Sequence, residues 1–213
     1  MTTYRNTFLL LLGTALVLAG CSTGNKRLND AERTNLGKAS AIHVLHYDTP
    51  LPQLRSPEKN APAPAAIRKT VAADPAAQIA SQFARALARQ EKLRNVQTPQ
   101  ALHRPVAQNA REFRDKLRDG LALEVWVDDW LISPVPGDTK SYALSLTSHA
   151  RLSRVTDGKQ LWRAEACRAN GMRSNKLALA DLTQGARLRK ALTAARDECA
   201  HQLLRDFAQR PGP

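Results

Sequence analysis

The sequence predicts an α+β domain in which an antiparallel sheet of about four strands is packed by two to three helices. Apolar and polar residues alternate over 121–127 and again over 142–152, which is typical of strands with one buried face. Asp157-Gly158 is a dipeptide favoured in hairpin turns. Apolar residues recur at helical spacing in three other stretches. The expected order is β-α-α-β-β-β-α, a three-strand meander plus an N-terminal strand.

The N-terminus carries a signal for export. The apolar run from Phe8 to Gly20 is too short to span a bilayer but has the length of a signal-peptide core. Leu18-Ala19-Gly20-Cys21 resembles the lipobox of bacterial lipoproteins. The resemblance implies that residues 1–20 are removed and that Cys21 carries diacylglycerol and an N-acyl chain. Several acyl chains together anchor a protein stably to a membrane. The alternative is an ordinary secretory signal followed by a chance cysteine.

Ser22, which follows the cysteine, matches the family pattern for sorting to the outer membrane. The resemblance therefore implies a lipid-anchored protein that faces the periplasm. Removing the leader leaves 193 of the 213 residues, enough for one domain. We expect a flexible tether over residues 21–40, a single domain over 41–209 and a short tail over 210–213.

The first half of the domain begins with a strand over Ala41–Tyr47, which is rich in β-forming residues. A proline-rich loop over 50–75 follows and holds six of the 12 prolines. Asp74 and Pro75 are typical of a helix start, and this helix is expected to run to about Lys92. A second helix is predicted by the apolar spacing of Val106, Ala110, Phe113 and Leu117.

The strand beginning at Leu121 carries the candidate binding residues. Strict alternation places Leu121, Leu123, Val125 and Val127 on one face and Glu124, Trp126, Asp128 and Trp130 on the other. Aromatic side chains among acids can form a surface that recognises a partner protein. The alternative, which we favour, is that helices pack on that face and bury the indoles.

The two remaining cysteines predict a disulfide. Once Cys21 is acylated, Cys167 and Cys199 are an even pair in an oxidising compartment. Cys199 belongs to the apolar stripe of a terminal helix expected over 182–208, and Cys167 ends the third strand of the meander. Their spacing is not CxxC, which makes a reactive thiol pair the weaker interpretation.

The charge is strongly basic, with a formal net charge of +13. Nucleic acid is excluded as a partner for a protein outside the cytoplasm. Anionic lipid, lipopolysaccharide, cell-wall glycan or an acidic protein stays open, as does a merely solvated surface, because no run of five basic residues is present.

No catalytic motif is recognisable, and we expect neither an enzyme nor a cofactor. The chain has no GxSxG, GxxxxGK[ST], HExxH or GxGxxG sequence. His43 and His46 fall on opposite faces of a strand, as do Asp128 and Asp129, so neither pair is expected to converge on a metal ion or a substrate bond.

The order of elements, the stretch LSLTSHARLSRVTDGKQLWRAEAC with its Asp-Gly turn and the lipid anchor resemble small α/β envelope lipoproteins. These include penicillin-binding-protein activators, the amino-terminal domain of TolB and auxiliary lipoproteins of ABC transporters for lipids. The resemblance implies a non-catalytic assembly, accessory or transport-auxiliary factor that contacts an envelope protein. The alternative function is a module that binds anionic lipid, lipopolysaccharide or glycan.

Overall fold

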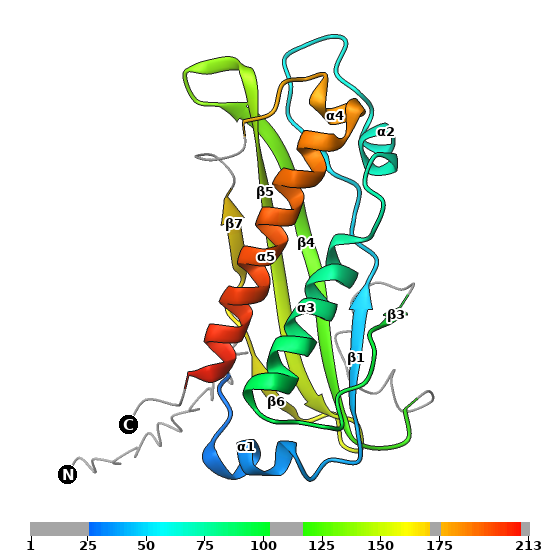
Figure 1. Cartoon of the computed structure of the whole chain (residues 1–213), viewed down its shortest axis with the longest axis vertical. Helices are drawn as coiled ribbons and strands as arrows, with labels where there is room; N and C mark the ends of the chain where they lie inside the picture. Colours follow the sequence, from blue (N-terminus) through cyan, green and yellow to red (C-terminus); the bar gives the residue numbers. More distant parts are fainter. Residues whose placement is uncertain (1–25, 103–116, 171–175, 210–213) are drawn as a thin grey trace, which may run out of the picture.

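A computed structural model describes residues 26–102, 117–170 and 176–209, and within them one mixed sheet is covered on one face by helices (Figure 1). The principal strand order is β3-β1-β4-β5-β6, with β2 beside β4 and β7 beside β5. The strands are β1 (Ile42–Tyr47), β2 (Gln53–Leu54), β3 (Gln100–Leu102), β4 (Leu121–Val135), β5 (Asp138–Arg154), β6 (Gln160–Arg163) and β7 (Cys167–Asn170). The helices are α1 (Asp30–Leu36), α2 (Pro64–Lys69), α3 (Pro75–Gln90), α4 (Asp181–Gln184) and α5 (Ala186–Ala208).

The predicted meander is present, but its third strand, expected to end at Cys167, is divided into β6, which ends at Arg163, and β7, which begins at Cys167. β4 and β5 form a long antiparallel hairpin, and β6 pairs antiparallel with the far end of β5. The sheet is nevertheless mixed, not purely antiparallel, because β1 runs parallel to β4. The chain between these strands crosses the sheet through α3, and such a crossover returns the next strand in the same direction.

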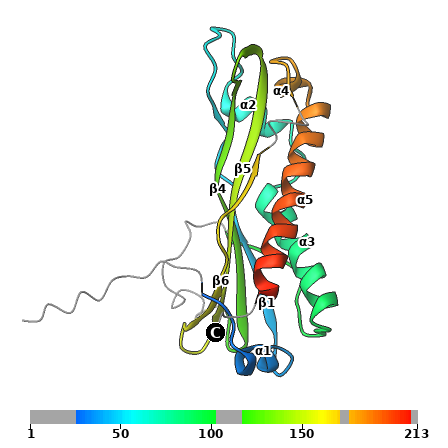
Figure 2. The ribbon, with the colours of Figure 1, turned by 90° about the vertical axis from the view of Figure 1, so that its left-hand side faces the viewer.

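Helices α3 and α5 lie side by side on what we call the first face of the sheet (Figure 2). Their apolar stripes meet alternate residues of β4 and β5 in the main core. At the β6 end of this core Trp162 packs edge-to-face against Phe207, with ring centroids 4.9 Å apart, and Phe83 lies 5.9 Å from the same indole. The predicted helix from Pro75 and the terminal helix therefore form because each buries one stripe against this face.

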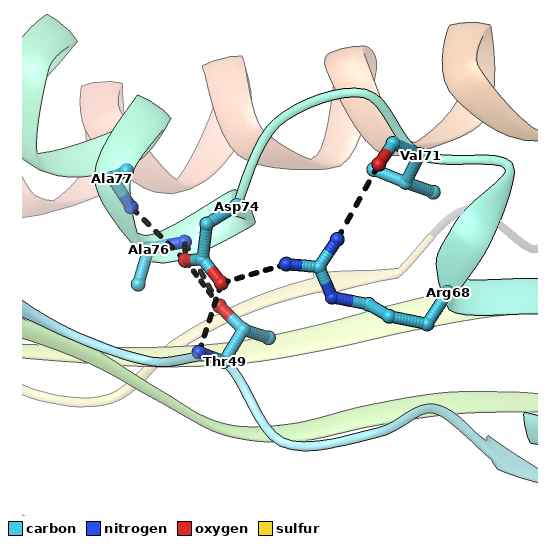
Figure 3. Close-up of polar contacts among 6 residues, drawn as sticks. All are labelled: Thr49, Arg68, Val71, Asp74, Ala76 and Ala77. Carbon is cyan, nitrogen blue, oxygen red and sulfur yellow. Dashed lines mark hydrogen bonds and ion pairs between the residues drawn. The ribbon is translucent and has the colours of Figure 1, made fainter. Parts of the chain in front are cut away.

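The start of α3 is tied to the end of β1 (Figure 3). Asp74 caps the helix by accepting from the backbone N–H groups of Ala76 and Ala77, as the sequence predicts. The same carboxylate accepts from the backbone N–H and the hydroxyl of Thr49, and it pairs with Arg68 at 3.1 Å. One carboxylate thus fixes the entry to the crossover.

The predicted tether is wrong over the residues that the structure describes. Lys26 forms a backbone bridge to Arg163 of β6, and helix α1 follows with Leu28 and Leu36 buried. A capping box between Asn29 and Glu32 stabilises the first turn of α1. The segment therefore belongs to the folded domain.

Two further expectations change in detail. The proline-rich segment contains β2 and α2, with Pro64 at the first position of α2. The terminal helix is divided into α4 and α5 at Gly185, whose φ of +81° interrupts the helix. The leader, Cys21, the 210–213 tail and most of the helix predicted from Val106 lie outside the described residues. Among the described helices, none is long and apolar enough to cross a membrane.

Candidate interaction site on the second face of the sheet

The predicted row of Glu124, Trp126, Asp128 and Trp130 is split between the two faces of the sheet. β4 and β5 pair in regular register up to Val127, and the pairing resumes at Asp129, so Asp128 is the extra residue of a β-bulge. The bulge reverses the alternation. Glu124 and Trp126 lie on the second face, opposite the helices, whereas Trp130 joins the main core.

Both tryptophans of this strand are buried, but the prediction that helices cover them is right only for Trp130, because Trp126 lies on the face without helices. Trp130 is fully buried under α3 and α5, and Trp126 is 6% exposed. Trp126 packs in a smaller cluster with Leu45, Tyr47, Ala122 and Val155. Exposed polar atoms on this part of β4 come instead from Asp128, whose side chain is 52% exposed.

A buried ion pair lies at the centre of the second face. Glu124 and Arg151 are directly opposite one another on β4 and β5. Arg151 donates from Nε and Nη2 to the two carboxylate oxygens of Glu124 at 2.5 and 2.7 Å, and Tyr47 donates its hydroxyl to the same carboxylate at 2.6 Å. The Glu124 side chain is completely buried, so the three partners satisfy a charge that would otherwise be costly to bury.

The ion pair continues into an aromatic stack. The Arg151 guanidinium lies 5.7 Å from the ring centroid of Trp126, and this indole stacks on His149 at 5.2 Å with an interplanar angle of 12°. His149 in turn bonds to Asp128 through Nε2 at 2.6 Å. A continuous polar and aromatic chain therefore runs from buried Tyr47 to Asp128 at the bulge.

Two of the side chains in this row, from Tyr47 to Asp128, have shifted pKa values. Burial lowers the pKa of His149, with Arg163 and Arg168 adding to the effect, and this outweighs the attraction of Asp128. The neutral imidazole therefore donates from Nε2 to the Asp128 carboxylate. Burial alone would lower the pKa of Arg151, but hydrogen bonds and charge from Glu124 raise it above its ordinary value.

This arrangement is suited to recognition. The carboxylates of Glu124 and Asp128 already have cationic or N–H partners, and a rigid aromatic stack lies between them. Sequence reasoning found Glu124, Trp126 and Asp128 but missed the contributions of Tyr47, His149 and Arg151. The strand register would have identified the last two, because Glu124 faces Arg151 and Trp126 faces His149 across the hairpin.

The predicted disulfide is present. Cys167 of β7 and Cys199 of α5 are joined, with both residues buried. The bond fastens the terminal helix to the edge of the sheet that lies beside β5. Within the described ranges, no group of three or more His, Cys, Asp or Glu side chains comes together as a metal site.

No family model matches the sequence, and no curated protein matches it. Among solved structures, a Xanthomonas campestris protein assigned to DUF330 is similar at 11% identity and a TM-score of 0.35, over 77% of this chain and 85% of that one. Lipoprotein GNA1162 from Neisseria meningitidis is similar at 15% identity and a TM-score of 0.30, over 70% of this chain and 95% of that one. The PelC dodecamer from Paraburkholderia phytofirmans is similar at 17% identity and a TM-score of 0.30, over 74% of this chain and 89% of that one. Likenesses at this level do not establish a shared function.

Proposed function

We propose that this chain is a lipid-anchored protein of the bacterial outer membrane, facing the periplasm, that acts without catalysis as an accessory factor through contact with another envelope protein. The observation that carries the proposal is the buried Cys167–Cys199 disulfide together with the lipobox ending at Cys21. Disulfides form and persist in oxidising compartments outside the cytoplasm. The bond and the lipobox therefore both favour a protein outside the cytoplasm.

The second face supports a role in protein contact. It presents Asp128 beside the stacked pair of Trp126 and His149, on a hairpin held rigid by a buried ion pair. Because Trp126 is buried, a partner would contact Asp128 and the partly exposed His149, while the indole holds His149 in place. No helix among the described residues packs on this face, in contrast to the first face (Figure 2).

The contact is tested by placing a photo-crosslinking amino acid at position 128 and irradiating intact cells. We expect one envelope protein, identified by mass spectrometry, to be captured from position 128. The matched control carries the same amino acid at exposed Lys190 on α5. Capture of the same proteins from both positions, or from an unrelated lipoprotein, would contradict the proposed contact surface.

The anchor is tested separately by the mass of the purified native protein. We expect a chain that starts at Cys21 and carries the mass of its acyl chains. An unmodified thiol at position 21 would overturn the location in the membrane without bearing on the crosslinks.

A further inference from the structure

The Lys26 end of the folded domain lies next to the predicted lipid anchor. Lys26 is part of the sheet, because its carbonyl accepts from the backbone N–H of Arg163 at 2.8 Å. Four residues lie between it and Cys21, and the five steps from one Cα to the next span at most about 18 Å when fully extended. Whatever path these residues take, an acylated Cys21 would hold the outer edge of β6 within that distance of the membrane.

This edge carries basic side chains without acidic partners. Arg163 and Arg168 belong to β6 and β7 and are directly opposite Arg151 and Thr147 of the second face. In the part of the chain that the structure describes, neither guanidinium forms an ion pair, and Arg168 is exposed. Burial is the main cause of the lowered pKa of His149, and the charges of both arginines are close enough to lower it further, against the opposing effect of Asp128.

The nearby carboxylates are engaged elsewhere. Glu124 is bound by Arg151, and Asp128 is bonded to His149. Glu165 lies between the two arginines in sequence but beside the end of α5, where it lines a pocket with Asp206. Burial raises the pKa of Asp206, and the charge of Glu165 raises it further. The surface formed by Lys26, Arg163 and Arg168 is therefore net positive, because its three cations outnumber the one nearby carboxylate among the described residues, that of Asp128, which keeps its charge beside neutral His149.

We propose that the surface formed by Lys26, Arg163 and Arg168 binds the anionic phospholipid headgroups of the leaflet that holds Cys21. This inference rests on the proposed lipid anchor and adds an orientation to it. Basic residues within a Debye length of a negatively charged membrane are attracted to it, and phosphate groups accept paired hydrogen bonds from guanidinium. The second-face edge that carries Arg163 and Arg168 then lies against the membrane, and β6 is at the end of the molecule opposite the β4–β5 turn (Figure 1). His149 lies next to both arginines, so Asp128, which bonds to it, would meet its partner protein at the membrane surface.

The chain offers a matched control pair far from this surface. Arg55 and Lys59 are exposed, and the backbone N–H of Arg55 donates to Ile132 near the β4–β5 turn. Ile132 is opposite Leu144, and Arg163 is opposite Arg151. These positions on β5 are seven residues apart, or roughly 24 Å. Arg168 is opposite Thr147, three residues or roughly 10 Å from Leu144, and three strand spacings, roughly 14 Å, also separate β7 from β2. Both separations exceed the Debye length at physiological salt.

The first test uses the chain from Ser22, which contains every described residue and carries no lipid, with vesicles of phosphatidylglycerol or phosphatidylcholine. We expect salt-sensitive binding to phosphatidylglycerol only. The double variant Arg163→Glu/Arg168→Glu should bind at least tenfold more weakly, whereas Arg55→Glu/Lys59→Glu, with the same change in net charge, should stay within twofold of the parent. Absent binding, or an equal loss in the two variants, would overturn the proposal.

Cooperative unfolding followed by circular dichroism checks that both double variants are folded. If the charge reversal prevents folding, Arg163→Gln/Arg168→Gln replaces it, with at least a threefold loss expected and an unchanged affinity overturning the proposal. The second test labels arginines with phenylglyoxal on the acylated protein in vesicles. Labelling of Arg168 should fall at least threefold in phosphatidylglycerol relative to phosphatidylcholine, while labelling of Arg55 is unchanged. Equal labelling of Arg168 would overturn the orientation, whereas an unmodified Cys21 would overturn the anchor itself.

Discussion

Glu124 and Arg151 form a bidentate ion pair across two neighbouring strands, with the carboxylate completely buried and the guanidinium side chain 12% exposed. Arg154 and Asp157 make a pair of similar length, 2.7 Å, but their side chains are 43% and 47% exposed. The two pairs therefore separate the effect of burial from the effect of distance.

We expect Glu124→Ala to lower the free energy of unfolding by about 3 to 5 kcal/mol, because it leaves the Arg151 guanidinium buried without its anion. The double variant Glu124→Leu/Arg151→Met should recover most of this loss, since it removes both charges. Arg154→Ala is the exposed control and should have little effect. Urea denaturation measures all three, and equal losses for Glu124→Ala and Arg154→Ala would contradict the argument.

The disulfide predicts a stability difference that depends on redox conditions. Cys167 and Cys199 are 32 residues apart in sequence, and closing a loop of this size stabilises the fold by about 3 to 4 kcal/mol in the chain-entropy model. We expect Cys199→Ala to lower the Tm by roughly 6 to 16 °C under oxidising conditions. In reductant the parent and the variant should melt together. A similar difference in Tm under both conditions would mean that packing of the thiol, and not the crosslink, stabilises the parent.

His149 predicts a loss of stability in mild acid. Its pKa is lowered in the folded protein, so below the ordinary value of 6.5 the unfolded chain binds a proton more readily than the folded one. The free energy of unfolding should therefore fall as the pH drops below about 6.5. Denaturation at pH 7.5 and 5.5 should show a smaller fall for His149→Gln than for the parent. His201→Gln, at an exposed position of α5, should keep the parent's pH dependence.

Two glycines with positive φ separate backbone strain from steric overlap. A Cβ at Gly137, with φ +78°, would meet nothing within 4 Å, whereas a Cβ at Gly120, with φ +88°, would lie 2.4 Å from the carbonyl oxygen of Ala41. Gly137→Ala should lower the free energy of unfolding by about 1 to 2 kcal/mol through strain alone. Gly120→Ala should cost clearly more, because β1 and β4 must separate locally. Thermal denaturation compares the two variants. Equal losses of stability would show that β1 moves away from the new Cβ without further destabilising the fold.

The alternation of β4 was predictable only up to the bulge. Leu121 to Val127 have the faces that a period of two assigns, but one inserted residue at Asp128 moves Trp130 to the opposite side. Two successive acidic residues before Trp130 were the local signal. A pattern alone does not say which of them is extra, because that is decided by how the partner strand β5 packs on the helices.

Helix α1 in the N-terminal segment could not be predicted from the sequence, for a different reason. The capping box formed by Asn29 and Glu32 was readable, yet α1 is too short for its apolar residues to repeat. Leu28 and Leu36 are buried only because the rest of the domain supplies a surface for them. The disulfide, the helix from Pro75 and the meander were predictable because each depends on strong local signals or on a single possible pairing.

The length of the β4–β5 hairpin also has a practical consequence for protein engineering. β5 has 17 residues, about three times the usual strand length, and extends for roughly 55 Å. The exposed turn at Pro136 and Gly137 is thus well beyond electrostatic reach of Lys26. A peptide tag or a fluorescent reporter grafted into that turn should leave attachment at the other extremity intact, which makes the turn the natural place to label the protein in living cells.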